Sequence, residues 1–133
     1  MSTQYRFEFE DRYRFPARIF GVTEQSAVVT VDATDIEAKF GRWTVRTPLT
    51  NVASVSITGP YSFLKTAGPA HLSVSDRGIT FATNSRRGVC LEFRRPVRGI
   101  EPAGVLKHPN LTVTVQDCDA LAEQLREIGR AHV

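Results

Sequence analysis

The fold is decided by the stretch Leu111-Thr-Val-Thr-Val115, which passes through Gln116-Asp117 into the run Cys118 to Gly129. The first part alternates apolar residues with threonine, and this period of two indicates a β-strand. In the second part, apolar residues recur with 3-4-3 spacing, which is typical of one face of a helix: Cys118, Leu121, Leu125 and Ile128. A last strand that leads directly into a single helix predicts a small β-structure closed at one end by that helix.

Residues at both ends of this run favour a helix over about 117–129. Asp117 can cap the first turn with its carboxylate, and Asp119 complements the positive end of the helix dipole. Gly129 suits the position just after a helix, and Arg126 lies where positive charge is favourable.

Upstream of this stretch, short β-patterned segments fill the chain. Tyr5 to Phe9 alternates aromatic with charged residues, so it predicts a half-buried strand. The charged segment Asp11 to Arg14 either extends that strand or ends it, and Pro16 limits continuous pairing. Ala17 to Val22 is interpreted as a second, shorter strand, and Ala27 to Val31 as a third.

The clearest local pattern is a hairpin around Phe40-Gly-Arg-Trp43. Apolar residues alternate with polar ones on both sides of the loop, and Gly at its first position suits a two-residue turn. With that loop, Phe40 opposes Trp43 and Ala38 opposes Val45, so the apolar residues of both strands share one face.

The second half of the chain contains further strand patterns and one long interruption. His71 to Val74 is expected to pair with Ile79 to Ala82 across a Gly-containing turn. Val89 to Phe93 alternates again. Arg94 to Asn110 holds three prolines and two glycines, so it is expected to be an irregular excursion.

Composition excludes several classes of protein. A chain of 133 residues is one domain in length, and its 41% hydrophobic content is ordinary for a globular protein. The net charge of +3 is too small for the dense basic face that uniform nucleic-acid binding needs, so no nucleic-acid partner is expected. No apolar stretch approaches the length of a membrane span, so stable membrane insertion is not expected.

The cysteine spacing predicts neither a disulfide bond nor a metal site. Cys90 and Cys118 form no Cys-x-x-Cys pair, and no histidine lies at zinc-ligand spacing from either. The N-terminus has no apolar core of signal-peptide length. We therefore expect a cytoplasmic protein with both thiols reduced and without a metal or cofactor.

The order of these elements resembles the bacterial pleckstrin-homology-like (PH-like) domains. Phe40 to Ile57 carries most of the likeness, including a Pro-Leu-x-x-Val segment at Pro48 to Val52. Leu111 to Leu125 carries the rest. The resemblance covers nearly the whole chain, and it is a resemblance of pattern rather than of invariant residues.

The resemblance implies a mainly β fold: a barrel of two near-orthogonal antiparallel sheets, about seven or eight strands in all, capped by one C-terminal helix. It implies a single domain over residues 1–133 that binds other molecules or oligomerises. Lipid-binding eukaryotic members carry a lysine- and arginine-rich run between their first two strands. Here that region has Arg12, Arg14 and Arg18 but no lysine, so we expect no specific phosphoinositide binding.

Two arginine clusters are candidate contacts for an anion or a partner. Arg86 and Arg87 lie at a turn, whereas Arg94, Arg95 and Arg98 lie beyond the following strand. An extended strand would place the clusters ~20 Å apart, so they are not expected to form one pocket. Solvated surface charge is the competing interpretation for both clusters.

The loop residues Tyr61, Phe63 and Leu64 are a candidate contact with a partner, and capping of an open barrel end is the alternative. No residue is predicted to be catalytic, since Cys90 and Cys118 are each interpreted as packing residues. The acidic turn at Asp32, Asp35 and Glu37 lacks the ligand density of a calcium loop, so it is expected to be solvated.

The leading hypothesis is therefore a non-enzymatic interaction module that binds a protein partner or assembles with itself, for example as a homo-oligomer. The first alternative is a carrier barrel for a small apolar ligand, similar to a lipocalin. A lesser alternative is a flavin-binding split-barrel reductase, although the phosphate-binding motif that such an enzyme needs is not apparent. An internal cavity of ligand size would favour the carrier, whereas a filled core would favour the interaction module.

Overall fold

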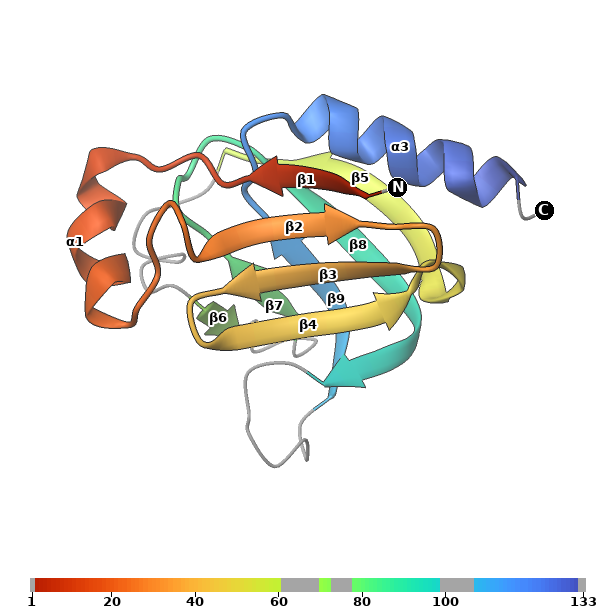
Figure 1. The fold of residues 1–133 in the computed structure, drawn as a ribbon, viewed down its shortest axis with the longest axis horizontal. Coiled ribbons are helices and arrows are strands. Elements are labelled where there is room, and N and C mark those ends of the chain that lie inside the picture. Colours follow the sequence, from red (N-terminus) through yellow and green to blue (C-terminus); the bar gives the residue numbers. More distant parts are fainter. Residues whose placement is uncertain (1, 61–69, 73–77, 99–106, 132–133) are drawn as a thin grey trace.

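The computed structural model describes residues 2–60, 70–72, 78–98 and 107–131, and the predicted partner loop Tyr61 to Leu64 lies outside them. The chain is mainly β, with strands grouped into two sheets and a helix at the C-terminal end (Figure 1). The elements are β1 (Thr3–Arg6), α1 (Asp11–Ile19), β2 (Ala27–Val31), β3 (Asp35–Phe40), β4 (Trp43–Pro48), η1 (Leu49–Asn51), β5 (Val52–Thr58), β6 (Ala70–Leu72), β7 (Ile79–Phe81), β8 (Gly88–Arg98), β9 (Lys107–Val113) and α3 (Cys118–Ala131).

The first sheet is an antiparallel meander with the order β1-β2-β3-β4. Its central hairpin confirms the predicted register, because Phe40 pairs with Trp43 and Ala38 with Val45. Gly41 has a φ of +65°, a conformation that glycine adopts without the strain of a side chain. A Cβ at this position would also lie 2.9 Å from the Val22 side chain, so the turn packs closely against the chain that precedes β2.

The predicted strand Ala17 to Val22 is wrong, because residues 11–19 form the helix α1. Tyr13 and Ala17 lie one helical turn apart, and both are buried, while Asp11 and Arg18 occupy the ends that suit their charges. The helix ends at Ile19, and Gly21 just beyond it has a φ of +80°. The N–H groups of Gly21 and Val22 donate to carbonyls of the last turn of the helix. A short alternation of apolar residues does not distinguish strand from helix, and in this segment the helical spacing is the correct one.

The second sheet has the order β5-β8-β9-β7-β6. The predicted pairing of His71 with the strand after it is confirmed, since His71 lies opposite Thr80. The pairing of β7 with β9 is parallel, so this sheet is mixed rather than purely antiparallel as expected. β9 begins near the end of β8 and runs back antiparallel to it. Its other edge pairs with β7, so β7 lies beside a strand that is distant from it in the sequence.

The expected irregular excursion from Arg94 to Asn110 is wrong in part. β8 continues through Arg98, and its last residues pair with the start of β9, as Val97 with His108 and Arg98 with Lys107. The register shifts between Glu92 and Val97, and Pro96 lies inside that shift. A proline in an irregular part of a strand removes no ladder hydrogen bond, which explains why the strand tolerates it.

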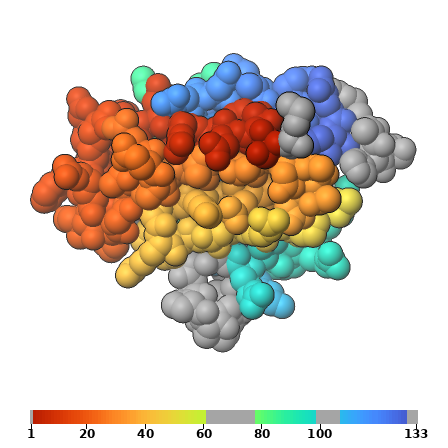
Figure 2. Space-filling model, viewed as in Figure 1, coloured from red at the N-terminus to blue at the C-terminus, as the bar shows by residue number. Residues whose placement is uncertain are grey.

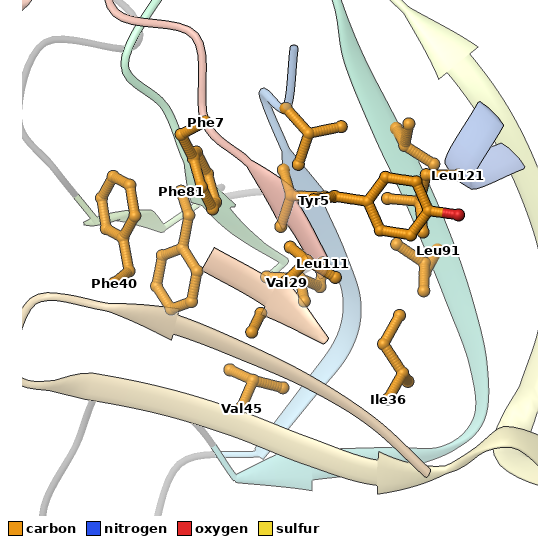
Figure 3. Close-up of a cluster of buried hydrophobic side chains, with 14 of the residues drawn as sticks. Tyr5, Phe7, Val29, Ile36, Phe40, Val45, Phe81, Leu91, Leu111 and Leu121 are labelled. Carbon is orange, nitrogen blue, oxygen red and sulfur yellow. The ribbon is translucent and has the colours of Figure 1, made fainter. Parts of the chain in front are cut away.

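The core lies between the two sheets and is filled by side chains from both (Figure 3). Its aromatic centre is a cluster of three rings in which Phe40 contacts both Phe7 and Phe81, with centroid distances of 5.0 Å and 4.7 Å. These three side chains are almost completely buried. The space that a carrier barrel would keep open is thus occupied here by large aromatic groups.

The C-terminal helix α3 packs against the second sheet beside β5 and β8, as Figure 1 shows. Leu121 is fully buried, Leu125 is nearly so, and Ile128 is partly buried against the core. The predicted cap is confirmed, because the Asp117 carboxylate accepts a 3.0 Å hydrogen bond from the N–H of Ala120. The Tyr5 hydroxyl of β1 donates to the side chain of Gln124, so α3 also contacts the first sheet.

Candidate interaction surface on helix α1

The predicted arginine pair at the turn before β8 is engaged in ion pairs. Arg86 lies 2.7 Å from the carboxylate of Glu8, and Arg87 lies 2.9 Å from that of Asp119. The hydrogen bond from Arg87, followed by its charge, lowers the pKa of Asp119. These arginines therefore connect the turn to the chain after β1 and to the first turn of α3.

The second arginine cluster lies on the exposed last part of β8. The Nε of Arg94 donates a 3.0 Å hydrogen bond to the Thr50 carbonyl. The backbone of Arg95 is held by the Asn51 side chain, which accepts from its N–H at 2.9 Å and donates to its carbonyl at 3.0 Å. The structure places Arg98 beyond them on the same strand, so the two predicted clusters are at opposite ends of β8 and do not form one site.

The structure also presents a surface that the sequence analysis missed. Phe15 is 75% exposed, Ile19 66% and Phe20 43%, and these are the exposed large hydrophobic residues of the described chain. Phe15 and Ile19 are one helical turn apart on α1, opposite the buried Tyr13 and Ala17. We call Phe15, Ile19 and Phe20 the α1 patch; α1 forms one end of the molecule, at the left of Figure 2.

Phe20 connects the α1 patch to the hairpin between β3 and β4. Its ring lies 6.1 Å from that of Trp43, measured between centroids. The guanidinium of Arg42 stacks over Trp43 at 5.2 Å, which is within the range of a cation–π contact. The apolar surface thus continues from α1 onto the Trp43 ring, and the positive charge of Arg42 lies over that ring.

A row of arginine runs along α1 beside the α1 patch. Arg14 donates to Asp11 at 3.1 Å and to Glu24, so two carboxylates balance its charge. Arg18 is one turn further along and is exposed. Within the described part of the chain, no carboxylate lies in ion-pair range of Arg18.

A surface pocket of about 250 Å³ adjoins this row. Its lining combines apolar and charged side chains from the chain before α1, from α1 itself and from the turn after it: Phe9, Arg14, Arg18, Val22, Thr23, Glu24 and Gln25. The guanidinium of Arg14 lies 5.7 Å from the centroid of the Phe9 ring, so it forms one side of the pocket. The arrangement can receive one side chain of a partner, with an anionic group beside Arg18.

Helix α1 is held in place by a buried polar segment between β7 and β8. The Glu10 carboxylate accepts hydrogen bonds from the N–H of Ser85 and, at 2.8 Å, from its hydroxyl. Arg12 donates to the same hydroxyl at 2.7 Å. The Glu8 carbonyl accepts from Thr83 at 2.6 Å and from Asn84 at 2.7 Å. These contacts fix both the start of α1 and the direction of the chain that leads into it.

The ionisation of Glu10 depends on these contacts. Burial alone would raise the pKa of Glu10, but the hydrogen bonds from Ser85 and the charges of Arg12 and Arg86 outweigh it, so the net shift is downward. The carboxylate is therefore stabilised in its charged form, and α1 is attached to the body of the protein by a charge-assisted contact.

Other chemistry is sparse in the described ranges. No group of three or more His, Cys, Asp or Glu side chains gathers there in an arrangement that could hold a metal ion. Burial raises the pKa of the Cys118 thiol, which keeps it protonated and weakly nucleophilic. None of the helices described has the length and apolar character needed to cross a membrane.

The α1 patch was missed because apolar residues are assigned to the core by default. The segment from Asp11 to Gly21 does carry a helical signal, with an acidic first residue, a basic last turn and a glycine just beyond. It also has two apolar pairs at i, i+4 spacing on opposite sides, and only one of them can face the core.

In comparisons with known proteins, no family model matched the chain, and neither the curated proteins nor the solved structures gave a match.

Proposed function

We propose that this chain is a non-enzymatic interaction module that binds a protein partner. The observation that carries the proposal is the α1 patch, in which Phe15, Ile19 and Phe20 expose large apolar side chains side by side. Exposed apolar patches on soluble domains mark interaction sites, because water disfavours such surface unless a partner covers it.

The packing of the interior supports this proposal over the ligand carrier. The rings of Phe7, Phe40 and Phe81 pack together in the space between the sheets, with Phe40 stacked on Phe81 and tilted against Phe7. The pocket beside α1 lies at the surface, and its volume of about 250 Å³ is below the roughly 300–1,000 Å³ of small-molecule sites. A pocket of this size suits one side chain of a protein better than a whole ligand.

The PH-like barrel is part of the proposal. A four-stranded meander, a second group of strands and a C-terminal helix follow in the order that the resemblance implies. α1 between the first two strands and the parallel pairing of β7 with β9 are departures from it. Assignment of function by fold alone would be an analogy, so the proposal depends on the α1 patch and not on the resemblance.

Peptide selection on the chain of 133 residues tests the proposal. A phage library of random peptides of about 16 residues, roughly four helical turns, is panned against the immobilised protein. Sedimentation velocity over a range of protein concentrations tests self-assembly in parallel. Native mass spectrometry after incubation with a mixture of fatty acids tests the carrier alternative.

We expect a reproducible family of bound peptides and no stoichiometric fatty-acid complex. Fatty acid bound one-to-one, without peptide enrichment or self-assembly, would replace the proposal with the carrier. If the chain selects no peptide and also stays monomeric, the interaction module is refuted.

A further inference from the structure

The size of the α1 patch limits what can cover it. A fully exposed large apolar side chain has an accessible surface of about 200 Å². Given their exposed fractions, Phe15, Ile19 and Phe20 together expose about 400 Å². Stable protein interfaces bury about 800 Å² on each partner. The patch therefore fits a short segment laid across α1 better than a large globular surface.

The charges beside the patch select the chemistry of that segment. Arg14 and Arg18 form a row at i, i+4 spacing, and Phe15 and Ile19 form the neighbouring row one residue further along the helix. The pocket with Phe9 and Val22 lies on the other side of the arginine row. Across α1, the surface thus changes from apolar to cationic and then to a pocket whose lining mixes Phe9 with polar and charged side chains.

A ligand that matches this order has apolar side chains on both sides of an acidic one. One apolar side chain enters the pocket, the carboxylate faces Arg18, and a second apolar side chain covers Phe15 and Ile19. Arg42 on the adjoining hairpin adds another positive charge near Trp43. We propose that α1 and its pocket dock a short acidic amphipathic peptide segment of a partner protein, an inference that rests on the proposed function.

A second copy of this chain fits the surface less well. A symmetric dimer through α1 would face the same patch on both subunits, and so would bring the two arginine rows together. The Arg18 guanidinium groups, which have no carboxylate partner in the described residues, would then repel each other. An acidic segment has the opposite charge and needs only the area that the patch offers.

The experiment uses the peptides that the folded chain selects. The most enriched sequence is synthesised with a fluorescent label, and its affinity is measured by anisotropy for the wild type and three variants. Phe15→Ser with Ile19→Ser removes the apolar row, Arg18→Glu reverses the charge, and Arg126→Glu on α3 is a matched control away from α1. All four positions are exposed, and thermal melting verifies that each variant is folded.

We expect enriched peptides that combine net negative charge with aromatic or aliphatic residues. The double serine variant and Arg18→Glu should each weaken binding by at least about tenfold, whereas Arg126→Glu should change it by less than about twofold. Higher salt should weaken binding to the wild type, whereas it should weaken the residual binding of Arg18→Glu less or even strengthen it, because salt also screens the repulsion that the reversed charge creates.

Three outcomes overturn the inference. Peptides that bind the double serine variant as tightly as the wild type place the site elsewhere, although the proposed function survives that result. Sedimentation with phosphatidylserine vesicles that is lost in the double serine variant, without peptide enrichment, assigns the surface to a membrane. Concentration-dependent dimerisation that the same variant abolishes assigns it to a second copy.

Discussion

Replacing Leu121 by alanine tests whether α3 is part of the core. Leu121 is fully buried where α3 packs beside β5 and β8, so its replacement by alanine removes three carbon atoms from the hydrophobic core. At about 0.8 kcal/mol for each carbon, the lost transfer free energy is about 2.4 kcal/mol. A cavity of about 70 Å³ at about 24 cal/mol per Å³ adds roughly 1.7 kcal/mol.

The free energy of unfolding should therefore fall by about 4 kcal/mol for Leu121→Ala. Leu125→Ala should cost somewhat less, about 2–4 kcal/mol, because Leu125 retains slight exposure. Urea unfolding followed by circular dichroism measures both, with the slope on denaturant expected to stay unchanged. Glu127→Ala on the exposed side of the same helix is the matched control and should change stability by less than about 0.5 kcal/mol.

A loss below about 1 kcal/mol for Leu121→Ala, at an unchanged slope, would refute this reasoning. It would mean that α3 is peripheral and that the sheets close without it. If the alanine variant does not fold, Leu121→Met keeps the volume and should cost less than about 1.5 kcal/mol.

Three further predictions follow from single positions. Gly59→Ala should destabilise the protein by more than about 2 kcal/mol, because Gly59 has a φ of +122° and a Cβ there would lie 2.2 Å from the Arg86 carbonyl oxygen. Gly129 was expected just after the helix, but α3 continues through Ala131 and includes it. A Cβ at Gly129 would have nothing within 4 Å, so Gly129→Ala should be neutral or slightly stabilising when both variants are compared by thermal melting. Equal losses of stability would show that Gly59 does not approach Arg86 tightly. The lowered pKa of Glu10 means that its contribution is present above the unfolded pKa near 4.5 and is lost as the pH falls through the folded pKa. Glu10→Gln should therefore lower the free energy of unfolding by about 1–2 kcal/mol at neutral pH. The variant should also lose less stability than the wild type between about pH 5 and 3, because it lacks the group that titrates. Urea titrations in which the two proteins show parallel pH profiles would contradict this. The Cys118 thiol, with its pKa raised by burial, should react with iodoacetamide far more slowly in the folded than in the urea-unfolded protein; similar rates, measured by peptide mass spectrometry, would show that the start of α3 opens readily.

Local pairings could be predicted from the sequence, whereas distant ones could not. The hairpin of β3 and β4 follows from the glycine in its turn and the alternation on both sides, so Phe40 and Trp43 were placed opposite each other correctly. The parallel pairing of Ile79 with Leu111 depends on the whole second sheet, and no local pattern encodes it. The continuation of β8 beyond Phe93 was missed because the prolines and glycines from Arg94 to Asn110 were interpreted as an irregular excursion, although the register shift accommodates Pro96.

The candidate surface was hidden from the sequence for a different reason. Periodicity tells which residues share a face, but it does not tell which face the rest of the protein covers. On α1, Tyr13 with Ala17 and Phe15 with Ile19 are equivalent pairs by spacing. The first pair is buried and the second exposed because Glu10 and Arg12 attach α1 to Ser85 in one orientation. That contact connects segments that are far apart in the chain.

The interleaved strand order of the second sheet determines when the protein can fold during its synthesis. All strands of the first sheet are available once Pro48 has left the ribosome. In contrast, β5 must wait for β8, β7 must wait for β9, and Phe7 must wait for Val115, with which it forms an isolated bridge. Until then, the second sheet cannot be completed over the inner apolar side of the first sheet, and closing such long loops slows folding. A nascent chain stalled before β9 should therefore be a client for chaperones, and completion of both sheets should be a single late event.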